Sequence, residues 1–220
     1  MKFAGKIGIL LYAASVMGGC SYPSDIEHFD ESNITPMQLT QMQEGEEIAV
    51  ITTTHGKITL RFFPSEAPDS MDIFIDMSEK GSYNGQALFV TQDDDDEFAA
   101  VQPKNTDETS YEAEVSYNLC PVSGAVAMYV DAYGKADGSF FIHSSNSITA
   151  EDTKELHEDG FPKIVAQVFG EMGGYPDRWL KDAVFAQVIE GQDIIDKIAD
   201  GDIADEKVII ENISIEKYEA

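Results

Sequence analysis

The sequence predicts a mainly β protein whose antiparallel strands form a barrel or a sandwich. Short apolar runs of strand length recur along the chain, and Gly, Pro or acidic residues separate most of them. Two short helices are expected, and they do not alternate with the strands as helices do around a parallel sheet. A chain of 220 residues, 43% of them hydrophobic, is long enough for one well-buried domain and a short appendage.

The first elements of this domain form a predicted hairpin followed by a helix. Residues 47–55 and 57–62 are rich in β-branched side chains and flank Gly56, as in two strands joined by a turn. Residues 64–68, with two prolines, end the hairpin. A helix is predicted over residues 70–80, where apolar side chains recur at helical spacing and Gly81 follows as a stop signal.

The later elements alternate short strands with polar or Gly-rich breaks. Residues 92–97 are an acidic run that favours a solvated loop, and residues 134–138 favour a turn with glycine. Residues 151–158 have helical character and lead into a Gly- and Pro-rich stretch, and residues 191–198 predict a short helix. The predicted strands are residues 87–91, 124–128, 139–142, 183–188 and 208–215, with a further apolar run at 99–102.

The N-terminus has the pattern of an export signal. Two lysines precede the mostly apolar residues 7–17, which are too few to span a bilayer, and Gly18 and Gly19 stand directly before Cys20. This end resembles a bacterial lipobox, which implies that residues 1–19 are a lipoprotein signal peptide and that Cys20 carries the lipid. The alternative is an ordinary secretory peptide that is cut nearby.

The resulting organisation is a lipid anchor, a tether and one domain. Residues 20–47 are polar and acidic without a sustained apolar period, so a flexible tether is expected, and residues 48–220 form the domain. The protein is then expected on the extracytoplasmic face of the bacterial cell membrane, attached through its lipid anchor only. We expect a monomer.

The net charge of −27 excludes one class of partner. Such a charge repels the phosphate backbone, so nucleic-acid binding is not expected. It is equally unsuited to docking on anionic lipid. Its simplest interpretation is solubility, and the alternative is recruitment of a basic partner.

Common catalytic and metal-binding motifs are absent from the sequence. It has no glycine-rich phosphate loop and no HExxH, CxxC or GxSxG motif, and its four histidines lack the spacing of metal ligands. The acidic residues 93–97 could collect calcium, but they lack the spaced ligands of an EF-hand loop. With Cys20 lipidated, Cys120 is left as a buried structural thiol. Neither a metal nor a cofactor is predicted.

Three segments in a fixed order resemble the cyclophilin family of peptidyl-prolyl cis-trans isomerases. The first is FPSEAP at 63–68 with GSYNG at 81–85, and the second is SGAVAM at 123–128 with GSFFI at 138–142. The third runs from GGYP at 173–176 through residues 183–198. The resemblance covers residues 48–215. It implies a closed antiparallel eight-stranded barrel with two capping helices and an outer groove that acts on X-Pro bonds of peptides without a cofactor.

The resemblance also implies a catalytic site that departs from the family's pattern. The arginine that weakens the conjugation of the prolyl nitrogen in this family is replaced by Val90, whereas the family's glutamine is kept as Gln102. Ala99 and Ala100 stand in place of two large pocket walls.

The remaining residues of the family's proline pocket are matched only in part by this sequence. Phe141 keeps the floor of the proline pocket, and Ser139 replaces a glutamine. Trp179 and Leu180 match the family's pocket Trp-Leu if two residues are deleted after Leu180; an ungapped alignment puts Asp177 there instead. The chain contains only two arginines, Arg61 and Arg178, and Arg178 lies in the loop that borders the pocket. It either replaces the missing arginine or is a surface residue that offsets nearby acids.

Three hypotheses follow. The first is a slow prolyl isomerase that assists the folding of exported proteins. The second is an inactive module that binds proline-containing segments. The third is an acidic surface protein whose barrel is a scaffold for the acidic loop or the tether.

Overall fold

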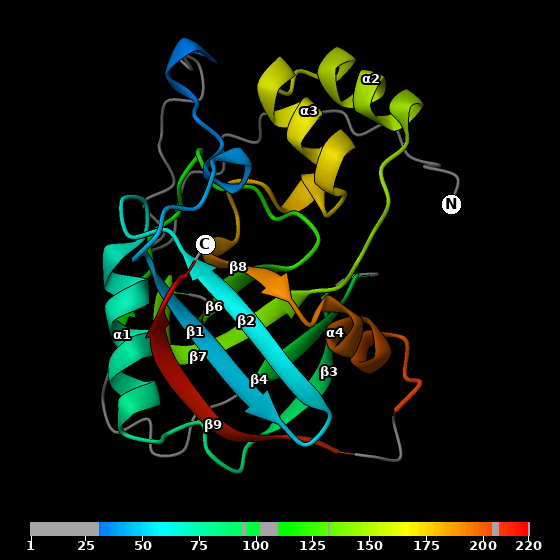
Figure 1. The fold of residues 1–220 in the computed structure, drawn as a ribbon. Coiled ribbons are helices and arrows are strands. Elements are labelled where there is room, and N and C mark those ends of the chain that lie inside the picture. The colour runs from blue at the N-terminus through cyan, green and yellow to red at the C-terminus, as the bar shows by residue number, and fades with distance from the viewer. Residues whose placement is uncertain (1–30, 94–95, 102–109, 132, 204–206, 220) are drawn as a thin grey trace.

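The computed structural model describes residues 31–93, 96–101, 110–131, 133–203 and 207–219, and its centre is a closed β-barrel (Figure 1). The sheet order is β4-β3-β9-β1-β2-β8-β6-β7-β5, all neighbours being antiparallel, and an added pairing of β4 with β7 closes eight of these strands into a ring. The two-residue strand β5 (Tyr111–Glu112) lies outside the ring on β7. The barrel strands are β1 (Glu47–Thr53), β2 (Gly56–Phe62), β3 (Ala87–Asp93), β4 (Asp96–Val101), β6 (Ala125–Val130), β7 (Lys135–His143), β8 (Ala183–Glu190) and β9 (Val208–Lys217).

This ring confirms the predicted closed antiparallel barrel of eight strands. The hairpin of β1 and β2 around Gly56 forms as predicted, with Thr53 paired to Gly56. Closure removes exposed strand edges, which an open sheet of this length would leave unpaired. Two strand boundaries differ from the predicted ones. The acidic run contributes residues to both β3 and β4, and β7 begins at Lys135, so Gly138 lies inside a strand rather than in a turn.

Helix α1 (Pro68–Glu79) closes one end of the barrel with an aromatic cluster. Its Phe74 ring lies 5.3 Å from Phe140 and 5.5 Å from both Tyr83 and Phe185, measured between ring centroids. All four rings are fully buried. Rings at such distances and angles contribute packing beyond the area that they bury.

The structure has four α-helices in its described part, where the sequence predicted two capping helices. Besides α1, these are α2 (Ala150–Glu158), α3 (Lys163–Met172) and α4 (Gln192–Ala199). Helix α3 was missed because its C-terminal glycines read as a loop, although its apolar residues recur at helical spacing. Helices α2 and α3 pack against each other beside the barrel (Figure 1). None of the described helices is long and apolar enough to cross a membrane.

The segment before β1 differs from the predicted flexible tether. Residues 34–46 run along the barrel with a short 3-10 turn, η3 (Met37–Leu39), and the Ile34 side chain is buried. Arg61 of β2 holds this segment, because its guanidinium donates to the Thr40 carbonyl oxygen at 2.6 Å and to Oε2 of Glu46 at 3.2 Å. Residues 1–30, including the signal peptide and Cys20, lie outside the described residues.

Candidate active site

A groove runs over the outer face of strands β3, β4, β6 and β7 and contains two adjoining cavities. The larger has a volume of about 480 Å³ and the smaller about 380 Å³. Both are lined by Thr91 and Tyr129, so they meet at these two residues. A groove with two compartments can hold an extended peptide with two neighbouring side chains in separate pockets.

The strand register decides which side chains face the groove. Phe89 pairs with Ala100, which pairs with Phe141; one step along, Thr91 pairs with Phe98, which pairs with His143. Directly paired residues project from the same face of a sheet. Members of both rows line the groove cavities, so these two rows lie on the outside of the barrel. The intervening row, Val90 with Ala99, projects from the opposite face.

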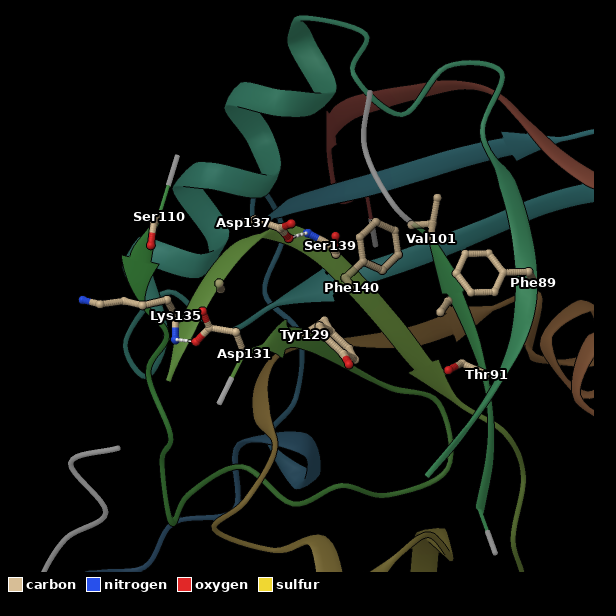
Figure 2. Close-up of a pocket in the computed structure, with 12 residues that line it drawn as sticks. Phe89, Thr91, Val101, Ser110, Tyr129, Asp131, Lys135, Asp137, Ser139 and Phe140 are labelled. Atoms are coloured by element: carbon tan, nitrogen blue, oxygen red, sulfur yellow. Dashed lines mark hydrogen bonds between the residues drawn. The ribbon is translucent and has the colours of Figure 1, made fainter. Parts of the chain in front are cut away.

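The larger cavity combines exposed aromatic rings with carboxylates (Figure 2). Phe89 and Tyr129 are 46% and 59% exposed, which is unusual for large apolar side chains. Asp131 and Asp137 lie across the cavity from Phe89, and the buried Ser139 forms part of its wall. This cavity can therefore accept a side chain that is apolar along its stem and polar or charged at its tip.

The smaller cavity places a guanidinium over two aromatic rings. The Arg178 carbon Cζ lies 5.0 Å from the Phe98 ring centroid and 6.0 Å from that of Phe141. Arg178 comes from the short turn η4 (Pro176–Arg178), in the loop that leads to β8. The cavity therefore offers an apolar floor beneath a planar cation, an arrangement that cation–π attraction stabilises.

A buried carboxylate orients this guanidinium. Asp182 accepts hydrogen bonds from Nε and Nη2 of Arg178 at 2.9 and 3.0 Å, and its side chain is 4% exposed. Burial alone would raise the pKa of Asp182, but its contacts with His143 and Arg178 outweigh burial and hold this pKa below the usual value. The bidentate pair fixes the plane of the guanidinium, which a single hydrogen bond would not do.

The fully buried His143 lies behind Asp182. Its Nε2 is 3.0 Å from Oδ2 of Asp182, although neither ring nitrogen makes a well-directed hydrogen bond within the described part of the chain. Burial lowers the pKa of His143, and Arg178 lowers it further, while Asp182 opposes both. Because burial is the largest effect, the imidazole is neutral at neutral pH, and Asp182 is left as the counterion of Arg178.

The structure brings only part of the predicted site residues to the groove. Ala100 and Ser139 line the larger cavity, and Phe141 lines the smaller one. Ala99 is fully buried on the inner face of the sheet. Val90 lines a separate apolar cavity with Ile198 and Val208 of β9, so it does not occupy the groove position from which an arginine would act.

The remaining predicted residues lie outside both cavities or outside the described residues. The Trp179 ring packs 5.7 Å from Phe161, between ring centroids, and Leu180 has a left-handed backbone with φ of 64°. Neither lines the groove cavities. Gln102 falls in residues 102–109, which the structure does not describe, as do Asp94 and Asp95 of the acidic run.

Phe89, Thr91, Phe98 and Asp182 are among the groove residues that sequence reasoning missed. Strict alternation along β3 was the available signal, because it places Phe89 and Thr91 opposite Val90. Asp182 follows Arg178 by four residues, but these residues form turns and not an α-helix, so the spacing alone does not predict the ion pair.

Cys120 is a buried free thiol, and burial raises its pKa to about 12. No group of three or more His, Cys, Asp or Glu side chains in the described ranges could hold a metal ion.

Comparison with known proteins agrees with this fold. Residues 48–220 match the family model of the "Cyclophilin type peptidyl-prolyl cis-trans isomerase/CLD". The chain belongs to the cyclophilin family. A Staphylococcus aureus (strain USA300) protein named "Putative peptidyl-prolyl cis-trans isomerase" is 27% identical over 195 residues, which cover 83% of this chain and 98% of that protein. A Staphylococcus epidermidis protein of the same name is 29% identical over 196 residues, with the same coverage.

A solved cyclophilin has the same fold. The crystal structure of a Cryptosporidium parvum cyclophilin type peptidyl-prolyl cis-trans isomerase superposes with a TM-score of 0.50. It is 15% identical and covers 79% of this chain and 99% of its own. At this identity the likeness concerns the fold alone. The cyclophilin barrel therefore accounts for residues 48–220, whereas the groove chemistry has to be argued from this chain's own side chains.

Proposed function

We propose that this cyclophilin isomerises X-Pro bonds of exported proteins with Arg178 as its catalytic cation. The protein would act on the extracytoplasmic face of the bacterial cell membrane, held there by a lipid on Cys20. The observation that carries the proposal is the position of Arg178 over the rings of Phe98 and Phe141 in a groove cavity. The sequence of residues 1–20 supports the location.

The chemistry requires a hydrogen-bond donor at the prolyl nitrogen. Rotation about the X-Pro bond is slow because resonance gives the C–N bond double-bond character, with a barrier of about 20 kcal/mol. A donor that meets the nitrogen lone pair stabilises the twisted state, in which the lone pair is no longer conjugated, more than either planar state. A proline ring held against Phe141 would bring its nitrogen under the Arg178 guanidinium.

The position of Arg178 also explains why turnover would be slow. Its guanidinium covers the Phe141 ring, which is 6% exposed, so a proline has to displace it in part before it reaches this floor. Asp182 engages two of the five guanidinium N–H groups. Movement of Arg178 therefore works against a buried bidentate pair, and this restraint should slow the cycle.

A second candidate function rests on the same restraint. If Arg178 remains paired with Asp182 while peptide is bound, the groove binds proline-containing segments and does not isomerise them. The observation that favours this alternative is that Val90, which the family resemblance aligns with the catalytic arginine, lines a cavity outside the groove.

NMR exchange spectroscopy on a proline peptide, with residues 22–220 of the protein, distinguishes the two functions. Uncatalysed exchange takes tens to hundreds of seconds, so even weak acceleration is measurable. We expect Arg178→Gln to reduce the acceleration by at least about tenfold, as removal of one transition-state donor does in other enzymes. The matched control is Lys181→Gln, which removes one positive charge from the same cavity and should change the acceleration less than about twofold.

Arg178→Lys separates charge from geometry, because lysine keeps the positive charge but lacks the planar fork that Asp182 holds. We expect it to behave like Arg178→Gln. Perturbed peptide shifts without any acceleration by the unmodified protein would instead identify the binding module. Acceleration that survives Arg178→Gln unchanged would remove Arg178 from the mechanism.

A further inference from the structure

The larger cavity of the groove is built for a positively charged side chain. We infer that it binds a lysine or arginine of the client, close in sequence to the proline that occupies the smaller cavity. The inference rests on the proposed function, because it assumes that a peptide lies in the groove. It adds a specificity that the proposed isomerase chemistry does not require.

Backbone groups hold both carboxylates of the cavity in place. Oδ1 of Asp131 accepts hydrogen bonds from the backbone N–H groups of Tyr133 and Lys135 at 2.8 and 2.9 Å. Oδ1 of Asp137 accepts one from the N–H of Ser139 at 2.9 Å. A cation that enters the cavity therefore meets carboxylates whose side chains lose little further freedom on binding.

Lys135, the lysine among the described residues that line this cavity, directs its charge elsewhere. Lys135 lies on the cavity wall, but its Nζ pairs with Oε1 of Glu112 at 3.0 Å. Figure 2 shows its side chain extending away from Phe89 and Tyr129. Among the described residues, the cavity lining thus has two acidic side chains, and its lysine already has a partner outside the cavity.

The apolar part of the cavity fits the stem of such a side chain. Phe89 and Tyr129 present their rings at 46% and 59% exposure, and both line the cavity. Lysine and arginine bury their methylene stems on apolar surface while the charged head reaches a polar partner. Aromatic faces also attract the cation itself. A glutamate would meet the same rings but would be repelled by the two carboxylates.

A buried hydroxyl provides independent evidence for a ligand. Ser139 is 5% exposed, it lines the cavity, and its Oγ makes no hydrogen bond with any residue that the structure describes. Buried hydroxyl groups in folded proteins nearly always have a partner. An ammonium or guanidinium N–H of a bound side chain would supply one, since a serine oxygen accepts hydrogen bonds.

The net charge of −27 would attract any basic peptide, so the test has to separate this general attraction from the cavity. We would measure the affinity of the full-length chain, in mild detergent, for peptides with one proline in an Ala-Gly host. A single lysine, arginine, glutamine or glutamate is placed in turn at each position from three before to three after the proline. NMR titration of the peptide gives Kd.

At one position, we expect the lysine and arginine peptides to bind about fivefold more tightly than the glutamine peptide, and the glutamate peptide to bind more weakly than it. This size of effect is what a few partly exposed charge pairs contribute. The double variant Asp131→Asn, Asp137→Asn should reduce this preference to less than about 1.5-fold. It keeps the oxygens that accept from the backbone and should leave the affinity for the glutamine peptide unchanged. The control is Glu155→Gln, Glu171→Gln, which removes the same charge from exposed sites on α2 and α3. It should retain the preference.

Each other outcome overturns the inference in a recognisable way. An equal preference in both double variants would show that the general field, and not this cavity, attracts the cation. Binding of the glutamine peptide without any gain from lysine or arginine would refute the cationic specificity and leave the proposed function intact. Failure of all peptides to bind would refute both together.

Discussion

Arg61 should stabilise the fold by fastening residues 34–46 to the barrel, and we propose Arg61→Met as the perturbation that tests this. The Arg61 side chain is 8% exposed and donates to the Thr40 carbonyl oxygen at 2.6 Å, to Oγ1 of Thr40 at 3.1 Å and to Oε2 of Glu46 at 3.2 Å. Methionine preserves most of the volume, so the substitution removes mainly the charge and its hydrogen bonds.

The expected loss of stability follows from the groups that lose Arg61 as their partner. A hydrogen bond to a charged group contributes about 1.5–3 kcal/mol, and breaking a buried ion pair costs about 3–5 kcal/mol. Glu46 is 29% exposed, so water replaces part of its lost partner, and the individual contributions are not additive. We therefore expect the free energy of unfolding to fall by about 3 kcal/mol.

Urea unfolding of residues 21–220 measures this change, and the matched control is Lys57→Met. Lys57 is exposed on the same strand, so its loss should change the free energy of unfolding by less than about 0.5 kcal/mol. Hydrogen exchange locates the effect. The Met37 and Gly45 amides, which donate to the carbonyls of Asn118 and Tyr218, should exchange faster in Arg61→Met. A loss below about 1 kcal/mol, or unchanged exchange at both amides, would mean that Arg61 does not fasten this segment.

Two further predictions concern the buried histidine and the anchor. Because burial lowers the pKa of His143 in the folded state, the unfolded chain binds the additional proton below about pH 6.5, and stability should fall as the pH decreases from that value. Urea midpoints at pH 7.5, 6.5 and 5.5 measure this fall in stability, which should be smaller in His143→Gln. An imidazolium signature for His143 in ¹⁵N NMR at pH 6.5 would contradict the lowered pKa. Cells fed a labelled fatty acid should label the unmodified protein and not Cys20→Ser, which should be released from the membrane, and label retained by Cys20→Ser would refute the anchor.

The barrel could be predicted from the sequence because its signals are local and repeated. The hairpin around Gly56 and the alternation in β9 each fix a strand without reference to the rest of the chain. Ordered segments that resemble a family then supplied the closure of the ring, which no single strand encodes. The missed helix α3 shows the limit. Pro162 at its start and the glycines at its end read as loop, although Val165, Val168 and Phe169 are all buried on one face.

The groove could be predicted only in part because side-chain facing depends on register. A shift of one residue moves every side chain of a strand to the other face of the sheet, so an alignment that is uncertain by one residue exchanges Val90 for Thr91. The pairing of Arg178 with Asp182, and the position of the guanidinium over Phe98 and Phe141, depend on where the loop lies in the fold, which the sequence does not give.

The two arginines of this chain lie in different surroundings, and we propose that they have different tasks: Arg61 stabilises the fold, and Arg178 acts on the prolyl nitrogen. Arg61 projects from a strand and meets acceptors that are fixed by the chain fold, so its position follows from the barrel itself. Arg178 projects from a loop, and the carboxylate of Asp182, which also lies beside the neutral His143, helps to orient its guanidinium. If Arg178 is the proposed catalytic cation, its bidentate pair with Asp182 sets the direction of the guanidinium in the groove cavity. Its effect on the prolyl nitrogen should then depend on Asp182, so Asp182→Asn should resemble Arg178→Gln in the exchange assay more closely than Lys181→Gln does.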